Sequence, residues 1–479
     1  MPSTGAVTMW LRRSAAVCVM AALTIDVVAG RWGGYVATPV PNLYLPDLLW
    51  VLGCALGVSL AVMRALPRPV LVTSGVVAAY LVVRAALAVG GPGVERALVL
   101  RDLAPLAFVA TVPLAAVALS RVPTRTLLWI LRIAPFVTVT GWLMSALGAI
   151  PESVSTALGG AALAGTWFPG RTEILGVALA IGVVAWGRFP QLTTPSNRWA
   201  AWAARAVQVL FVLLSVVAPS QGGQVAAGLA VVWAVLREWR PVTGRRAVVL
   251  GLAIVAVLGS ITIALMGTAV LVTREQPVPV PLSKPGAVAR ADGTVPRYVS
   301  RDRLVYRVDY TPQGMGTILA RMSTYSEVLH SSAADGTWLT GSGIGQPDRL
   351  LAACGVTLAE FEDNHDDNKC SVDSGLGGVL RDPHNWALNL LLYQGVVGVA
   401  IVAGALLAYW WRPPPDPAFS LTAIPAALYL VIASFSVIAS APFGILPIAG
   451  FTAFAISRRL RSDATDRVAA SDTTSRDNL

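Results

Sequence analysis

A histidine lies where a hydrophilic stretch of the chain meets an apolar one, in the sequence Asp-Pro-His-Asn-Trp at 382–386. The hydrophilic stretch, 273–383, is a loop of about 110 residues, and the apolar stretch continues to about Trp410. Loops of this length disproportionately carry binding or catalytic groups. A neutral imidazole can accept a proton from a hydroxyl or orient it. His384 is therefore the first candidate for chemistry, and the alternative is an interfacial hydrogen-bonding group.

The residues that follow the histidine have the spacing of a helix. Pro383 suits the first turn of a helix, so we expect His384 near the positive end, where the neutral imidazole is favoured. Asp382 opposes that bias, which leaves the protonation state open. The glycines of the segment would let a neighbouring helix approach closely beneath the histidine. Five residues share one face of the helix predicted for 385–410: His384, Leu388, Leu391, Gly395 and Gly398.

The composition of the chain indicates that these residues belong to a membrane protein. Hydrophobic residues make up 55% of the chain, charged residues 13%, and the mean hydropathy is +0.65, which a soluble domain could not keep off its surface. With about 20 apolar residues per span, the sequence predicts an all-α integral membrane protein of about 12 transmembrane helices. The predicted spans are 13–30, 43–63, 70–90, 99–119, 126–149, 171–188, 200–219, 221–237, 247–272, 385–410, 418–436 and 440–457.

Basic residues give the orientation, because cytoplasmic loops collect Lys and Arg. If both termini are cytoplasmic, 273–383 is one large extracytoplasmic loop between helices 9 and 10, in a multi-pass protein of the cytoplasmic membrane. The net charge of +10 is then mostly a topology signal, with no nucleic-acid partner implied. A signal peptide is the alternative for the first span, but Asp26 argues against it. The arginines that mark every second connection are Arg12, Arg13, Arg64, Arg68, Arg121, Arg125, Arg188, Arg198, Arg237, Arg240, Arg245, Arg246, Arg412, Arg458, Arg459 and Arg461.

The domain organisation follows from these boundaries. Helices 1–9 occupy 1–272, the loop 273–383, helices 10–12 384–461, and a polar tail 462–479 is expected to be disordered. In the loop, Cys354 and Cys370 are expected to form a disulfide in an oxidising compartment, with two free thiols as the alternative. The acidic run at 360–369 lacks the turn glycine and the terminal acid of a calcium loop, so no metal site is predicted.

The motifs around the histidine resemble those of a known family. Pro383, His384 and Asn385, with Leu388 three residues on and Gly395 and Gly398 further along, resemble the proline-histidine-asparagine signature of the bacterial O-antigen ligase and polymerase family. The segment from Arg321 to Leu329 and the glycine-rich turn 341–345 resemble that family's arginine, short helix and turn. The resemblance is recognisable over about 160–460 and extends loosely to the whole chain.

This resemblance implies an integral membrane glycosyltransferase. It would move a glycan from a polyprenyl diphosphate carrier to a glycan, lipid or protein acceptor at the outer face of the membrane. Such a reaction needs a cation that binds the diphosphate and a group that orients or deprotonates the acceptor hydroxyl. By resemblance, Arg321 would bind the diphosphate, His384 would orient or deprotonate the acceptor hydroxyl, and Asn385 would bind substrate. Neither a metal nor another cofactor is implied, and membrane lipids are the remaining partners.

The chain departs from the family at one position. The family commonly has an arginine after a serine at the outer end of the eighth span, and here Gln221 follows that serine. Glutamine can hydrogen-bond a phosphate but cannot neutralise it. Three arginines near the predicted outer ends of spans could substitute: Arg171, Arg101 and Arg84. Acids lie close to Arg101 and Arg171, so local charge neutralisation is an alternative for both, whereas Arg84 lies inside its span.

Two other classes of function stay open at this stage. A transporter or flippase for a lipid-linked glycan would have internal repeats and broken helices near the membrane midplane, and the two halves of the sequence show no clear repeat. A non-catalytic scaffold for envelope assembly would use the loop 273–383 for docking. It would tolerate loss of Arg321 and His384 but not disruption of the loop.

Overall fold

The computed structural model describes a helical bundle and a few short segments outside the helices. Eleven helices lie in the described residues, and each overlaps one of the twelve predicted spans, although α1 begins nine residues before its span and α18 ends well beyond its span. The remaining predicted span, 247–272, lies outside the described residues. The described residues are 4–29, 44–61, 66–89, 96–146, 172–187, 189, 192, 198–217, 221–238, 276–278, 305–307, 329, 332–333, 336–344, 385–412, 414, 417–433 and 442–476.

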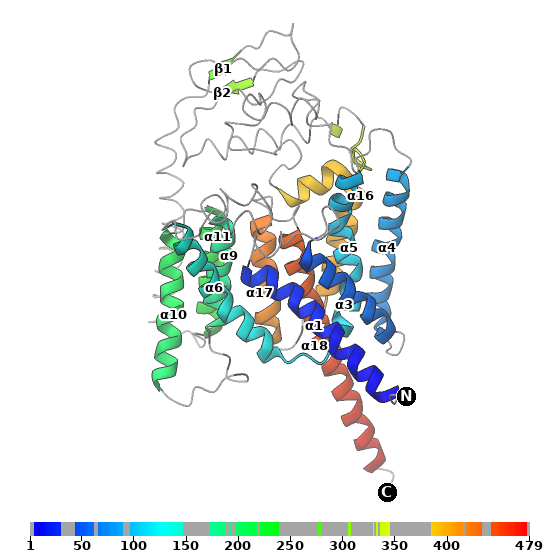
Figure 1. Ribbon diagram of the computed structural model, residues 1–479, viewed down its shortest axis with the longest axis vertical. Helices are drawn as coiled ribbons and strands as arrows, with labels where there is room; N and C mark the ends of the chain where they lie inside the picture. The colour runs from blue at the N-terminus through cyan, green and yellow to red at the C-terminus, as the bar shows by residue number, and fades with distance from the viewer. Residues whose placement is uncertain are drawn as a thin grey trace.

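The helices form one bundle, with the start of α1 and the end of α18 at the same end of it (Figure 1). Their bounds are α1 Thr4–Ala29, α3 Leu45–Ala61, α4 Arg68–Val89, α5 Arg96–Leu119, α6 Thr124–Ala146 and α9 Thr172–Ala185. The others are α10 Arg198–Val217, α11 Gln221–Glu238, α16 Trp386–Trp410, α17 Ala418–Ala433 and α18 Pro442–Arg476.

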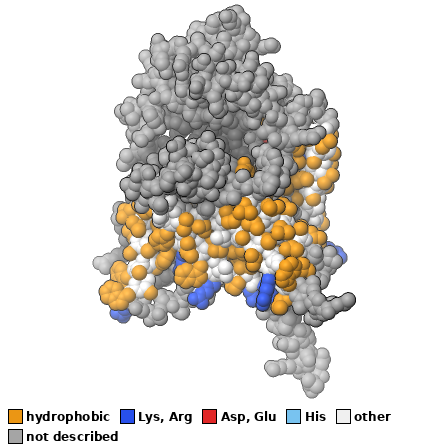
Figure 2. Space-filling model, in the orientation of Figure 1, with side chains coloured by type: hydrophobic (Ala, Val, Ile, Leu, Met, Phe, Trp, Pro, Cys, Tyr) orange, Lys and Arg blue, Asp and Glu red, His pale blue; other side chains and the backbone are white. Residues whose placement is uncertain are grey.

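Three helices of the described residues are long and apolar enough to cross a membrane: Arg68–Val89, Asp102–Leu119 and Trp386–Trp410. Several others are apolar but shorter. Large apolar side chains face outward, and Val72, Val82 and Leu87 of α4 are each more than 60% exposed. Figure 2 shows these side chains as a broad band, with Lys and Arg gathered along one edge of it. An outer surface this apolar belongs in lipid, so the chain has the character of a membrane-embedded helical protein.

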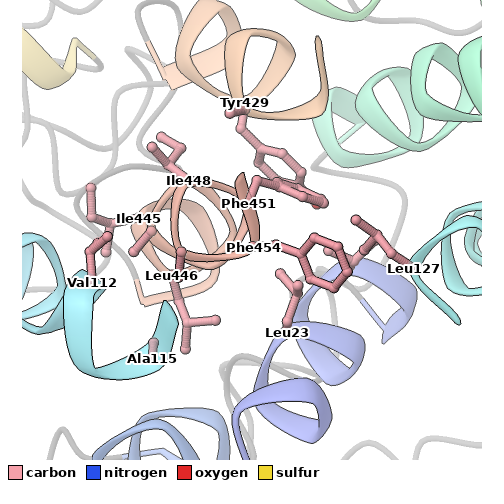
Figure 3. Close-up of a cluster of buried hydrophobic side chains, with 14 of the residues drawn as sticks. Leu23, Val112, Ala115, Leu127, Tyr429, Ile445, Leu446, Ile448, Phe451 and Phe454 are labelled. Atoms are coloured by element: carbon pink, nitrogen blue, oxygen red, sulfur yellow. The ribbon is translucent and has the colours of Figure 1, made fainter. Parts of the chain in front are cut away.

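The interior of the bundle is packed with aliphatic and aromatic side chains where α1, α5, α6, α17 and α18 meet (Figure 3). Phe454 is fully buried among Leu23 of α1 and Leu127 of α6, and the rings of Tyr429 and Phe451 lie 6.2 Å apart. Because helices in lipid associate through close packing rather than water exclusion, this cluster holds the bundle together.

Three arginines stabilise helix ends: Arg132 inside α6, and Arg458 and Arg459, which are among the arginines that give the orientation. Arg132 Nε donates to the carbonyl of Ala185, the last residue of α9, at 2.9 Å. Arg458 Nη2 donates to Leu119, the last residue of α5, at 3.1 Å, and Arg459 donates to Tyr409 near the end of α16. A cation at a helix C-terminus satisfies carbonyls that lack intrahelical donors and opposes the negative end of the helix dipole. These arginines therefore stabilise three helix ends.

One expectation about a polar segment is corrected. The tail that begins at 462 was expected to be disordered, but α18 continues to Arg476. The sequence has no proline or glycine between Phe451 and Arg476, so nothing ends the helix once the apolar part has started it. Outside the helical bundle, β1 (Gln276–Val278) pairs with β2 (Val305–Arg307) in a short antiparallel ladder.

Candidate functional site

Helix α16, which follows the Pro-His-Asn sequence, is broken at Gly395. This residue has φ 68° and ψ −175°, a conformation that only glycine adopts readily, and it divides α16 into two half-helices, 386–394 and 396–410. In Figure 1 the yellow start of α16 runs across the top of the bundle, and the rest turns to run beside α5. Contrary to the prediction, Leu388 and Leu391 therefore do not share one continuous helix face with Gly398.

The carbonyl groups at the end of the first half-helix are satisfied by distant residues. The backbone N–H and the hydroxyl of Ser342 both donate to the Leu392 carbonyl at 2.8 Å. Arg84 Nη2 of α4 donates to the Tyr393 carbonyl at 2.6 Å, and the Tyr80 hydroxyl donates to the Gln394 carbonyl at 3.1 Å. Three consecutive carbonyls freed by the break thus each receive a donor.

The N–H groups at the start of the second half-helix are also satisfied. Val396 donates to the Trp338 carbonyl at 2.9 Å and Val397 to the Leu339 carbonyl at 3.2 Å. Gly341, with φ 72°, lies so close to Tyr393 that a Cβ there would come within 2.3 Å of its carbonyl carbon. We refer to residues 338–342, together with Tyr80 and Arg84, as the clamp. The predicted glycine-rich turn is thus one half of a backbone-to-backbone contact with Gly395, rather than an isolated turn.

The depth of the break explains why these five backbone groups are each paired. The 15 residues from Val396 to Trp410 rise about 22 Å, less than the roughly 30 Å hydrocarbon layer of a bilayer. If Trp410 is near one membrane surface, Gly395 is inside the hydrocarbon layer or at its far edge. Non-helical backbone at that depth persists only when it is buried in protein. Gly395 is buried, and the clamp covers it.

Arg84 lies in the middle of this arrangement. Its side chain is only 7% exposed, and its Nε atom has no hydrogen-bond partner among the described residues. The negative end of the 386–394 half-helix offers its guanidinium a partial countercharge. Arg84 was a candidate ligand for the carrier phosphate, which stays a prediction, and in the structure its Nη2 atom donates to the Tyr393 carbonyl. Gly395 and Gly398 were expected to admit a helix, and the group that approaches Gly395 is the Leu339 carbonyl.

We expect Arg84→Met to destabilise the protein by about 1–3 kcal/mol, because the buried Tyr393 carbonyl loses its donor. Arg84→Lys, which keeps a donor, should retain part of the stability. The measurement is thermal unfolding of the purified protein in detergent. Arg68→Met on the exposed start of α4 is the matched control and should leave the midpoint unchanged. Equal midpoints for Arg84→Met and the control would contradict the clamp role.

Asn385 is the N-cap of α16. Its side-chain oxygen accepts from the backbone N–H of Leu388 at 3.1 Å, and its own backbone is extended. The cap stabilises the half-helix by about 1 kcal/mol. Pro383 was expected in the first turn of the helix. The helix begins only at Trp386, so both Pro383 and His384 come before the N-cap in the sequence. Asn385 was predicted to bind substrate, and its side-chain oxygen also has this local task.

Most of the other predicted site residues lie outside the described part of the chain. Arg101 and Gln221 belong to α5 and α11, but their side chains are not among those described. Within the described residues, no group of three or more His, Cys, Asp or Glu side chains could hold a metal ion. The predicted residues outside the described part are His384, Arg321, Arg171, Cys354 and Cys370.

Sequence reasoning missed the partners that hold α16. Tyr80, Ser342 and Gln394 were not predicted to belong to a site. Gln394 is 1% exposed, and its Nε2 atom lies 3.5 Å from the Asp102 carbonyl of α5. The available signal was two sets of glycines, one at 341–345 in the hydrophilic loop and one at 395 and 398 in the apolar helix. Nothing in the sequence says that these two sets touch each other.

The described part of the chain defines a class: a membrane-embedded helical protein in which helix α16 is broken at Gly395 and the open ends are closed by the turn 338–342. No protein-family model matches the chain, and no curated protein matches it.

Proposed function

We propose that this protein is an integral membrane glycosyltransferase of the ligase or polymerase type. It transfers a glycan from a polyprenyl diphosphate carrier to an acceptor at the outer face of the cytoplasmic membrane. The proposal includes a 12-span topology with both termini cytoplasmic and the 273–383 loop extracytoplasmic. Arg321 and a second cation hold the diphosphate, and His384 orients or deprotonates the acceptor hydroxyl.

One observation carries this proposal. The motif resemblance has two parts far apart in the sequence, the glycine-rich turn and the helix that follows Pro-His-Asn, and nothing in the sequence requires them to meet. In the structure Ser342 and Leu392 are hydrogen-bonded, and Gly341 and Gly395 lie backbone against backbone. A shared site would need both parts in one place. The clamp also fixes the half-helix directly after His384, which favours a positioned histidine over a mobile one.

The contacts of Arg84 narrow the choice of the arginine that supplies the second positive charge for the diphosphate. Arg84 is engaged with the Tyr393 carbonyl inside the bundle, so it is a weaker candidate than the sequence indicated. Arg171 and Arg101 remain the candidates for the position that Gln221 leaves uncharged. Either would act beside Arg321 as a fixed positive charge where the diphosphate leaves.

The transporter alternative gains support from the broken helix, which it predicts. In transporters, however, the open ends of half-helices are the groups that bind the substrate or the coupling ion. Here Trp338 and Leu339 occupy the N–H groups of Val396 and Val397, and Ser342 and Arg84 occupy the opposing carbonyls. Closed ends favour a rigid support over a transport site. The scaffold alternative has no specific observation in its favour.

The test is His384→Ala in cells, with the membrane abundance of the variant measured. We expect carrier-linked glycan to accumulate and finished envelope glycan to be lost, because the acceptor hydroxyl is no longer oriented. The matched control is Ser332→Ala in the same loop, which should leave both glycans unchanged. Normal finished glycan at normal abundance of His384→Ala would remove the histidine from the reaction and favour the scaffold.

A further inference from the structure

Two buried polar side-chain atoms in the first turn of the half-helix 386–394 have no hydrogen-bond partner among the described residues, and a third, Oε1 of Gln394, lies at its far end. The two in the first turn are the indole nitrogen of Trp386 and the side-chain oxygen of Asn389. These residues are three apart in a helix, so their side chains lie on the same side, one turn from each other. One atom is a donor and the other an acceptor, yet they do not bond to each other.

Leaving such atoms unpaired is costly, and a comparison with other tryptophans of the chain shows that a partner can be provided. A buried donor or acceptor without a partner loses about 1–3 kcal/mol of stability. Other tryptophans avoid this loss. The indole nitrogen of Trp50 donates to Thr111 Oγ1 at 2.9 Å, and that of Trp410 donates to Thr452 Oγ1 at 3.2 Å. Among the described tryptophans, Trp386 is the one whose buried nitrogen lacks a partner. It follows His384 by two residues, so a bound ligand is one way to provide that partner.

We propose that Trp386 and Asn389 form a subsite for a sugar hydroxyl of the glycan, an inference that rests on the proposed transferase function. A hydroxyl is both a donor and an acceptor, so it can accept from Trp386 Nε1 and donate to Asn389 Oδ1 at once. A phosphate oxygen only accepts, and it would be repelled by the Asn389 oxygen. The subsite therefore serves the sugar rather than the diphosphate.

The position of the subsite agrees with this assignment. Trp386 and Asn389 follow His384 by two and five residues, on a half-helix whose far end is held by Arg84 and Ser342. Trp386 also packs against the hydrophobic core, which fixes its ring. The glycan hydroxyl bound there would be held within reach of the residues that surround the histidine, as a reacting or a neighbouring hydroxyl must be.

The test compares stability with transfer for Trp386→Phe and Asn389→Leu, with Trp410→Phe as the matched control. Removing an unpaired buried polar atom should leave the thermal midpoint of the purified protein unchanged or raise it by about 1–3 °C. Trp410→Phe removes a paired indole and should lower the midpoint. In cells, both subsite variants should raise the ratio of carrier-linked to finished glycan about tenfold, the effect of one lost hydrogen bond, and the control should not change it.

Two results would overturn the subsite. A lower midpoint for both subsite variants would mean that the two atoms are satisfied by protein or by a bridging water. An unchanged glycan ratio with normal abundance would mean that they bind no substrate. The transferase proposal is decided separately by His384→Ala in the same cells. Glycan accumulation with His384→Ala but not with the subsite variants would reject the subsite alone, and no accumulation with His384→Ala would reject the transferase proposal.

Discussion

Gly395→Ala is expected to prevent α16 from adopting its broken conformation, with a loss of about 3 kcal/mol or more. Two costs combine in this variant. The backbone conformation at Gly395, φ 68° and ψ −175°, is nearly inaccessible to alanine. The new Cβ would also lie 2.2 Å from the Leu339 carbonyl oxygen and 2.5 Å from the Gly341 nitrogen. These are backbone atoms, so no side-chain rotation relieves the contact.

The structure has only poor ways to accommodate this alanine. If the 338–342 segment moves away, the N–H groups of Val396 and Val397 and the carbonyl of Leu392 lose their partners. Unpaired backbone groups at membrane depth cost several kcal/mol each. If α16 straightens instead, the direction of 386–394 changes, and His384 moves with it. Either response separates the two parts of the motif.

The measurement is the midpoint of thermal unfolding in detergent, together with the ratio of carrier-linked to finished glycan in cells. We expect Gly395→Ala to lower the midpoint by about 5 °C or more and to reduce transfer. Gly404→Ala is the matched control, because it lies in the same helix with nothing within 4 Å of its new Cβ. It should be neutral or slightly stabilising. A Gly395→Ala protein as stable and active as Gly404→Ala would show that the clamp is not needed.

Gly176→Ala is expected to separate α9 from α11. The Cβ of an alanine at 176 would lie 2.2 Å from the Cα of Gly223, and 3.1 Å from its carbonyl carbon. Two glycines thus let the two helix backbones touch, the packing that small residues permit in membranes. Helix backbones cannot yield as side chains do, so the helices must move apart, and we expect a loss of about 3 kcal/mol, at the upper end for overpacking.

This prediction can be checked without knowing the substrate. Thermal unfolding of Gly176→Ala should show a clear fall in midpoint, while Gly75→Ala on α4, with nothing within 4 Å, should not. Because α9 begins one residue after Arg171 and α11 begins at Gln221, we expect a change at this crossing to affect both candidate positions for the diphosphate. A stable Gly176→Ala protein would mean that α9 and α11 do not meet closely at these glycines.

Much of the helical framework could be predicted from the sequence. Apolar stretches of about 20 residues allow few structures other than a helix in lipid, and helices are found at every predicted span within the described residues. Composition was a poorer guide to the ends of helices. The polar tail after 462 was expected to be disordered because its residues bury little, yet it continues α18, since an existing helix extends at little cost.

The site was predicted less well than the framework. The motif at 382–386 drew attention to the start of α16, but the break at Gly395 was read as an uninterrupted face. A glycine inside an apolar helix is compatible with close packing, with a kink or with no special role. Only the neighbouring groups decide between these, and they come from α4 and from 338–342. The role of Arg84 could not be predicted for the same reason. An arginine in a span can bind a ligand, or it can donate to the carbonyls at the end of another helix, and the sequence does not distinguish the two.

The sequence by itself determined the class of protein, the places of the helices and the segment where chemistry is proposed. These depend on local composition and on residues close together in the chain, which the physics of lipid and of helices constrains strongly. The tertiary structure alone decided that Gly341 meets Gly395, that Arg84 and Tyr80 hold 386–394, and that α9 touches α11 at two glycines. The reason is that a backbone donor or acceptor can be satisfied by any suitable group in the chain. Which group does so depends on how the helices pack.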